Sequence, residues 1–174
     1  MQPPKEGPRW LTHGWELNSL IAIHGGEPFS VLSPTDNSGT GEGFQRGVQV
    51  SDPYAGVQHS LVNGSEFWIN PASFGPGPTG TFAGTSRKDQ IYGPGYQDVD
   101  FSVFKTGTIH EKVKVQFRAE LFNLFNHYNF APPLNVADGQ SLGQIYDTIG
   151  DYNGAPGIGP GEPFNTQFAL KILF

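Results

Sequence analysis

The sequence predicts an all-β fold, an antiparallel meander of about four long strands joined by long loops rich in glycine and proline. Four segments, near 9–23, 97–105, 112–122 and 166–174, alternate apolar and polar residues with the period of two that is typical of a strand. Aromatic residues make up 13% of the chain, and 24 glycines and 15 prolines interrupt it. No apolar run approaches the roughly 18 residues of a membrane-spanning helix, although a membrane barrel would show none either. We treat residues 1–174 as a single region.

Composition excludes several classes of function. The net charge of −6 argues against a nucleic-acid partner, which normally requires a basic patch. The absence of cysteine excludes disulfide frameworks, thiolate zinc sites and cysteine nucleophiles. Residues 1–8 are polar and rich in proline, without the apolar segment of a signal peptide. If the chain belongs to a membrane barrel, we therefore expect it to be a fragment of a longer protein.

The first predicted strand, near 9–23, has one apolar side that His13 and Ser19 interrupt. The residues of that side are Leu11, Trp15, Leu17, Ile21 and Ile23. A loop over 25–96 follows, with many glycine and proline breakers and little periodicity. We expect short strands inside this loop, near 47–50 and 66–69.

The second and third strands, near 97–105 and 112–122, form a predicted β-hairpin with a turn at 106–110. Their apolar sides are Val99, Phe101 and Val103, and Val113, Val115, Phe117, Ala119 and Leu121. Residues 119–125 have a spacing that also suits a helix. We favour the strand because the alternation upstream runs directly into this segment.

A second long loop, over 123–165, carries four acidic residues and no lysine or arginine. The chain then ends in a strand over 166–174. Its nine residues approach the roughly 9–11 that a tilted strand needs to cross the hydrocarbon of a bilayer. The apolar side of this strand consists of Phe168, Leu170, Ile172 and Phe174.

The order of strands and loops distinguishes two readings. Short turns at one rim and long loops at the other are typical of outer-membrane barrels, and the predicted order has this asymmetry. A soluble β-sandwich is the alternative, because its strands alternate in the same way. In a barrel, Lys114, Arg118 and Glu120 would face the lumen, and the aromatic residues would form girdles at the membrane interfaces. The aromatic candidates are Trp10, Trp15, Phe101, Phe104, Phe117, Phe122, Phe125, Tyr128 and Phe168.

Several phrases of the sequence resemble one protein family. The run from Gly93 to Lys105 (GPGYQDVDFSVFK), the run from Val115 to Phe130 (VQFRAELFNLFNHYNF) and the closing QFALKILF look like the last strands of TonB-dependent outer-membrane receptors. They are most similar to the Oar-like branch, which carries an N-terminal carboxypeptidase-regulatory-like domain. The resemblance implies the C-terminal part of a transmembrane barrel of about 22 strands with an internal plug.

The resemblance also implies a location and partners. We expect the chain to lie in the cell outer membrane and to contact its lipid. We also expect the barrel-assembly machinery to recognise the C-terminal residues Phe168, Leu170, Ile172 and Phe174. About four strands cannot close a barrel, so the remaining partner is the rest of a receptor barrel and its plug, or further copies of the chain. The resemblance implies transport driven through the TonB complex.

Local motifs give no catalytic, cofactor or metal residue. Residues 75–80 fit the letters G-x-G-x-x-G, but no βα unit surrounds them. Residues 36–42 offer oxygen ligands as calcium sites do, yet lack the EF-hand spacing, so a solvated turn is favoured. No H-x-x-x-H pair occurs among His13, His24, His59, His110 and His127. We therefore expect no enzyme and no cofactor, with a metal-dependent enzyme on a β scaffold as the less favoured alternative.

Overall fold

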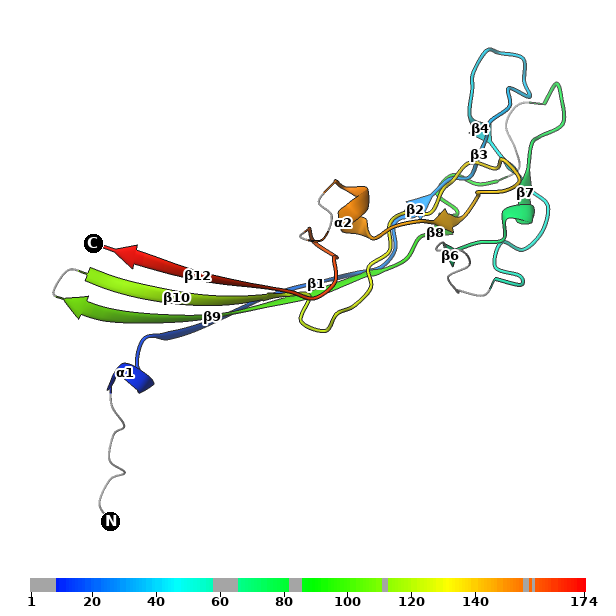
Figure 1. The fold of residues 1–174 in the computed structure, drawn as a ribbon. Coiled ribbons are helices and arrows are strands. Elements are labelled where there is room, and N and C mark those ends of the chain that lie inside the picture. The colour runs from blue at the N-terminus through cyan, green and yellow to red at the C-terminus, as the bar shows by residue number, and fades with distance from the viewer. Residues whose placement is uncertain (1–8, 58–65, 82–85, 111–112, 155–156, 158) are drawn as a thin grey trace.

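The protein is described by a computed structural model that covers residues 9–57, 66–81, 86–110, 113–154, 157 and 159–174. It has two parts, a long narrow sheet and a group of loops gathered at one end of that sheet (Figure 1). Strands dominate it, and the described helices are single turns. The predicted all-β class is confirmed.

The sheet contains four antiparallel strands in an order that follows the chain, so the predicted meander is confirmed. In spatial order these strands are β1 (Trp15–His24), β9 (Tyr96–His110), β10 (Val113–Phe122) and β12 (Asn165–Leu173). The C-terminus, the last residues of β9 and the first residues of β10 lie at the end opposite the loops (Figure 1). This is the distribution of turns and long loops expected for an outer-membrane barrel.

The first strand begins later than the predicted 9–23. Residues Arg9–Thr12 form the single helical turn α1, and the indole N–H of Trp15 donates a hydrogen bond to the Leu11 carbonyl at 2.8 Å. Gly14 then adopts a φ of +81°, a value that a residue with a side chain rarely adopts. The apolar spacing before Gly14 therefore belongs to a capping turn and not to the sheet.

The predicted turn at 106–110 is also wrong, because β9 continues through His110. Residues 106–108 pair with 114–116 of β10, and the connection falls on 111–112, outside the described residues. Two threonines flank Gly107, and β-branched residues suit a strand. The helical alternative for 119–125 is wrong as well, since β10 runs to Phe122 and the chain turns at Asn123 with φ of +46°.

The loops form a compact cap, which we define as the described part of residues 25–95 and 123–164. Pairs of two-residue strands hold it together, and they include strands inside both expected segments, 47–50 and 66–69. The pairs are β2 (Pro28–Phe29) with β8 (Ile91–Tyr92), β3 (Leu32–Ser33) with β4 (Gln45–Arg46), β5 (Val48–Gln49) with β7 (Phe74–Gly75), and β6 (Glu66–Phe67) with β11 (Gln144–Ile145). A 3-10 turn, η1 (Pro71–Ser73), and the helical turn α2 (Ile149–Tyr152) complete it.

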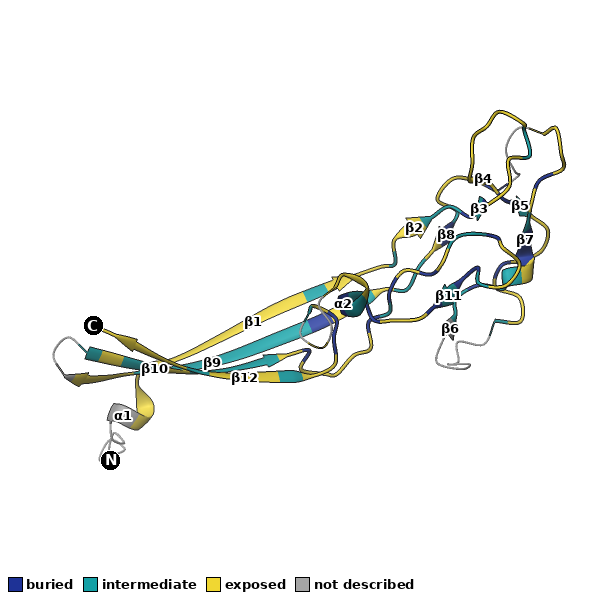
Figure 2. Cartoon of the chain, turned by 45° about the horizontal axis from the view of Figure 1, so that its top comes forward, coloured by how far each residue is buried: buried dark blue, intermediate teal, exposed yellow. Residues whose placement is uncertain are grey.

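The hydrophobic core lies in the cap and not in the sheet. Buried residues concentrate among the loops, whereas β1 and β12 are mostly exposed (Figure 2). The core cluster consists of Val31, Ile69, Phe74, Ile91, Ala137 and Leu142, with Phe29 and Trp68 packed against it. The cap is therefore a small folded unit whose apolar residues come from distant parts of the chain.

The β-sandwich alternative is not supported. A sandwich needs a second sheet packed on the apolar face of the first, about 10 Å away. Within the described ranges no second sheet covers the apolar face of the four-stranded sheet, and on this face Leu17 is 64% exposed and Leu170 is 68% exposed.

The junction between sheet and cap allows a test with two adjacent glycines. A Cβ on Gly26 would lie 1.7 Å from the backbone oxygen of Gly93, whereas a Cβ on Gly25 would meet no atom within 4 Å. We expect Gly26→Ala to lower the free energy of unfolding by about 1–3 kcal/mol, because backbone must move to admit the methyl group. Urea unfolding of the detergent-folded chain measures this change. Gly25→Ala is the control, and equal stabilities of the two variants would contradict the described junction.

Candidate functional site

The apolar face of the sheet is continuous across all four strands. Leu17 lies opposite Val103, Val103 opposite Ala119, and Ala119 opposite Phe168, and residues directly opposite each other share a face. Phe117 and Phe168 stack on this face with ring centroids 6.1 Å apart. We define the apolar face as Leu17, Ile21, Ile23, Val99, Phe101, Val103, Val115, Phe117, Ala119, Leu121, Phe168, Leu170 and Ile172.

Two polar side chains on the same side of the sheet have specific partners. The hydroxyl of Ser19 donates to the carbonyl of Asp100 at 3.0 Å, which satisfies the polar group that interrupts β1. The ammonium of Lys105 lies 4.7 Å from the ring centroid of Trp15 and donates to the His13 carbonyl. Lys105 thus reaches toward the end of the sheet near α1, as a lysine does when it keeps its charge at a membrane interface.

The opposite, polar face carries a side-chain network. Arg118 donates from Nε to Gln116 Oε1 at 2.8 Å, and Gln116 donates from Nε2 to Thr106 Oγ1 at 3.1 Å. The Arg118 guanidinium also lies 4.8 Å from the ring centroid of Phe104. Phe104 is thus on the polar face, and its assignment to an interfacial girdle is wrong. Apart from Lys105, the charged side chains of the four strands lie on this polar face.

The closing strand β12 displays the four C-terminal residues singled out from the sequence. Phe168, Leu170 and Ile172 lie on its apolar side and pair through β12 with Ala119, Phe117 and Val115, while Phe174 follows the end of the strand. All four are exposed. One edge of β12 pairs with β10, and no described strand pairs with the other edge. The terminal residues thus form an exposed apolar row beside a free strand edge.

Two buried asparagines organise the junction of cap and sheet: Asn129 joins the cap to β9, and Asn123 joins two parts of the cap. The fully buried Asn129 accepts a hydrogen bond from the backbone N–H of Gln97 at 2.8 Å and donates one to the carbonyl of Gln97 at 2.9 Å. Its side-chain amide thus makes the two hydrogen bonds that a neighbouring strand would make with this residue of β9. Asn123 accepts the N–H of His127 at 2.9 Å and donates to the carbonyls of His127 and Glu162 at 2.7 and 2.8 Å. These roles were not predicted. The sequence signal that could have indicated a structured turn here is the recurrence of asparagine at 123, 126 and 129, since asparagine tolerates a positive φ.

The cap folds over the outer part of the polar face. A hollow of about 300 Å³ lies between β1, at Leu20 and Ala22, and residues 159–163 of the second loop. Glu162 is buried there and accepts hydrogen bonds from the Thr148 hydroxyl and from the Asp151 N–H, the latter at 3.0 Å. The second loop thus covers the polar side and leaves the apolar face open.

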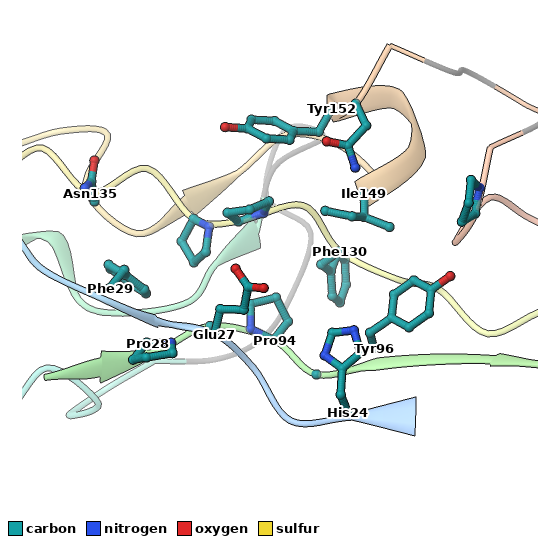
Figure 3. Close-up of a pocket in the computed structure, with 16 residues that line it drawn as sticks. His24, Glu27, Pro28, Phe29, Pro94, Tyr96, Phe130, Asn135, Ile149 and Tyr152 are labelled. Atoms are coloured by element: carbon teal, nitrogen blue, oxygen red, sulfur yellow. The ribbon is translucent and has the colours of Figure 1, made fainter. Parts of the chain in front are cut away.

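A larger cavity of about 550 Å³ opens where the sheet meets the cap (Figure 3). His24 and Tyr96, the last pair between β1 and β9, stack in its wall with ring centroids 5.0 Å apart and an angle of 11° between the ring planes. Phe130 and Tyr152 of the second loop lie across from them, with the side chain of Glu27 between the strands and that loop (Figure 3). Pro94, Pro132 and Pro133 complete the apolar wall. Rings and prolines with few polar groups are the usual lining of a small-molecule site.

Residues 36–42 form a turn that uses its own carboxylate. Asp36 Oδ1 accepts the N–H of Gly39 at 2.9 Å and Nε2 of Gln45 at 2.8 Å, and Oδ2 accepts the N–H of Gly41 at 2.7 Å. The Gly41 hydrogen bond is the main reason that the pKa of Asp36 is lowered. Both carboxylate oxygens are committed to the loop, in agreement with the turn interpretation.

The remaining sequence candidates have local structural roles. In residues 75–80, the N–H of Gly80 donates to the Asn37 carbonyl at 2.6 Å, so this segment joins two loops of the cap. The described residues contain no group of three or more His, Cys, Asp or Glu that could hold a metal ion. His59 lies outside the described residues, and His127 contacts the Asn129 side chain at 3.2 Å.

A second acidic turn allows a prediction about pH. The Ser141 hydroxyl, together with the N–H groups of Ser141 and Gln140, holds the pKa of Asp138 at about 2. A lowered pKa stabilises the folded turn above the ordinary value of 3.8, and this contribution is lost as the pH falls through about 2. We expect NMR titration of Asp138 to give a midpoint near 2, and Ser141→Ala to move it toward 3.8. An unchanged midpoint in that variant would contradict the assigned cause.

The helices of the described part are too short or too polar to cross a membrane.

Comparison with known protein families gives one match. A family model described as an outer membrane beta barrel domain matches residues 5–153, which is most of the chain. Comparisons with curated proteins and with solved structures give no match. The matched region includes β1, β9, β10 and most of the cap.

Proposed function

Because the chain belongs to the outer membrane beta barrel domain family, we propose that it is the C-terminal barrel segment of a TonB-dependent outer-membrane receptor of the Oar-like, carboxypeptidase-regulatory-like branch. In this proposal its strands face lipid, its cap contacts a ligand outside the cell, and transport is driven through the TonB complex. The protein resides in the outer membrane. We propose no catalytic role for the chain.

The observation that carries this proposal is the division of the sheet into two faces. The apolar face is exposed on β1 and β12 and half-buried on β9 and most of β10, while the Arg118 network and the cap occupy the other side. A barrel wall requires this division, with apolar side chains toward lipid and polar side chains toward the lumen. The cap lies at one end of the sheet, as expected for a barrel with long loops on the outer side of the membrane and short turns on the inner side.

The free edges of the sheet support further strands as partners. Among the described strands, β1 and β12 each pair on one edge only. In lipid, every unpaired N–H or C=O group would cost several kcal/mol, so both edges of the sheet must pair with further strands there. We propose that the remainder of a receptor barrel, enclosing a plug, supplies the missing strands; further copies of the chain are the alternative.

The C-terminal strand supports a second partner. Phe168, Leu170, Ile172 and Phe174 form an exposed apolar row next to the free edge of β12. We propose that the barrel-assembly machinery reads this row and pairs with that edge before the barrel closes.

The receptor assignment has a direct test in the gene. We expect the genomic DNA upstream of the Met1 codon to encode, in frame, a plug with a TonB-contact segment and a signal peptide. A stop codon and a separate start site immediately upstream would contradict the receptor segment, and would leave assembly from several copies as the remaining route to a closed barrel.

A further inference from the structure

We propose that the cavity at the junction of sheet and cap binds an organic cation, a guanidinium or ammonium group on an apolar body, with Glu27 as its counter-ion. This inference rests on the proposed function, in which the cap contacts a ligand, and it names the chemical class of that ligand. Three features support this inference: the size and aromatic lining of the cavity, the negative charge of its lining, and the negative charge of the cap around it.

The cavity has the size and lining of a ligand site. Its volume of about 550 Å³ falls within the roughly 300–1,000 Å³ typical of small-molecule sites. Tyr96, Phe130 and Tyr152 line it with rings, and the faces of such rings attract a cation within about 6 Å of their centroids. A group that is both apolar and positively charged would use these walls best.

The charge of the lining selects the sign of the ligand. Among the described residues that line the cavity, none is lysine or arginine, and Glu27 is the carboxylate among them. The Glu27 carboxylate receives no hydrogen bond and forms no ion pair with another described residue, whereas its backbone carbonyl accepts the N–H of Gly93 at 2.9 Å. The charge of the side chain is therefore available to a ligand. Nδ1 of His24 lies 3.0 Å from the Gly25 carbonyl, so this nitrogen faces the backbone and not the ligand.

The surroundings of the cavity favour the same sign. The two cap segments contain ten Asp and Glu and three Lys and Arg, a formal charge of −7, while the whole chain carries −6. The negative charge of the protein is thus concentrated on the cap. A field of this kind raises the local concentration of cations and repels anions.

A pair of isosteric probes tests the proposal in the full chain folded in a nonionic detergent. Nα-acetyl-arginine amide carries a guanidinium, and Nα-acetyl-citrulline amide has nearly the same shape without the charge. Calorimetric titration is expected to detect binding of the arginine probe and at least tenfold weaker binding of the citrulline probe. Maltose serves as a third probe, because aromatic side chains beside polar groups also bind neutral sugars, and a sugar is the alternative ligand for this cavity.

Two variants with the same loss of charge separate contact from the general field. Glu27→Gln is expected to weaken binding of the arginine probe about tenfold, which corresponds to about 1.4 kcal/mol. Glu42→Gln, an exposed cap residue outside the cavity lining, removes one charge as well and is expected to leave the affinity within about twofold. Circular dichroism confirms that each variant has folded.

Four results would overturn the proposal: no binding of the arginine probe by the folded chain, equal binding of both amides, unchanged affinity in Glu27→Gln, or binding of maltose without binding of the arginine probe. The last result would identify a neutral sugar as the ligand. These outcomes are independent of the receptor assignment. If the folded chain binds no cation, the proposed ligand class is wrong, but the receptor assignment is unaffected. If the gene encodes no plug upstream of the chain, the receptor assignment is wrong, but the binding result still holds.

Discussion

Replacing Leu170 with lysine is expected to lower the free energy of unfolding in lipid vesicles by about 2–4 kcal/mol. Leu170 is 68% exposed on the apolar face and lies opposite Phe117 near the middle of β12. A lysine there places its charge against hydrocarbon, where water cannot solvate it. Phe117→Lys, on the neighbouring strand, is expected to have a similar cost. Urea titration of vesicle-reconstituted protein, followed by tryptophan fluorescence, measures both.

Gln167→Lys is the matched control, because it adds the same charge to the same strand on the polar face. Gln167 lies opposite Glu120, so the new ammonium would have a carboxylate as its cross-strand neighbour. We expect a change of less than about 0.5 kcal/mol in either direction. Comparable losses for Leu170→Lys and Gln167→Lys would mean that lipid does not lie on the apolar face.

Replacing Asn129 with alanine is expected to cost about 2–5 kcal/mol and to loosen the cap from the sheet. The variant removes the partner of both the N–H and the carbonyl of Gln97, two part-buried hydrogen bonds made by a fully buried side chain, at about 1–3 kcal/mol for each group. Amide hydrogen exchange at Gln97 should therefore accelerate together with exchange in the cap. Asn153→Ala is the control, because Asn153 is an exposed cap residue at a φ of −83° that alanine also adopts.

Exchange that stays unchanged at Gln97 in Asn129→Ala would show that the asparagine does not hold the two parts together. Faster exchange in the sheet without a change in the cap would also contradict the assigned role, since the pair joins a cap residue to the first residues of β9.

The strands were predictable because each carries a local signal. In β12, and in the part of β9 that contains Val99, apolar residues recur at every second position, and this period is independent of distant contacts. The two strand ends that were predicted wrongly lie where a tertiary contact overrides the local pattern. Gly14 ends the turn before β1 with its carbonyl accepting the Thr106 N–H at 2.8 Å, and residues 106–108 remain in β9 because β10 pairs with them.

The cap was not predictable in the same way. Its core brings together Val31, Ile69 and Leu142, and β6 pairs with β11 across more than seventy residues of sequence. Strands of two residues are too short to show a period. The cavity is likewise made by residues that are distant in the sequence, since Glu27, Tyr96 and Tyr152 meet only in the folded chain.

Contact of the apolar face with lipid is the central claim, and a nitroxide scan along β12 tests it most directly. The chain contains no cysteine, so single cysteines introduced at each position from 167 to 172 can be labelled without background. In lipid vesicles, labels at 168, 170 and 172 should collide with oxygen, which concentrates in hydrocarbon, and labels at 167, 169 and 171 should not. Equal oxygen accessibility on both sides of the strand, or greater accessibility to a water-soluble nickel reagent at 168, 170 and 172, would contradict the account.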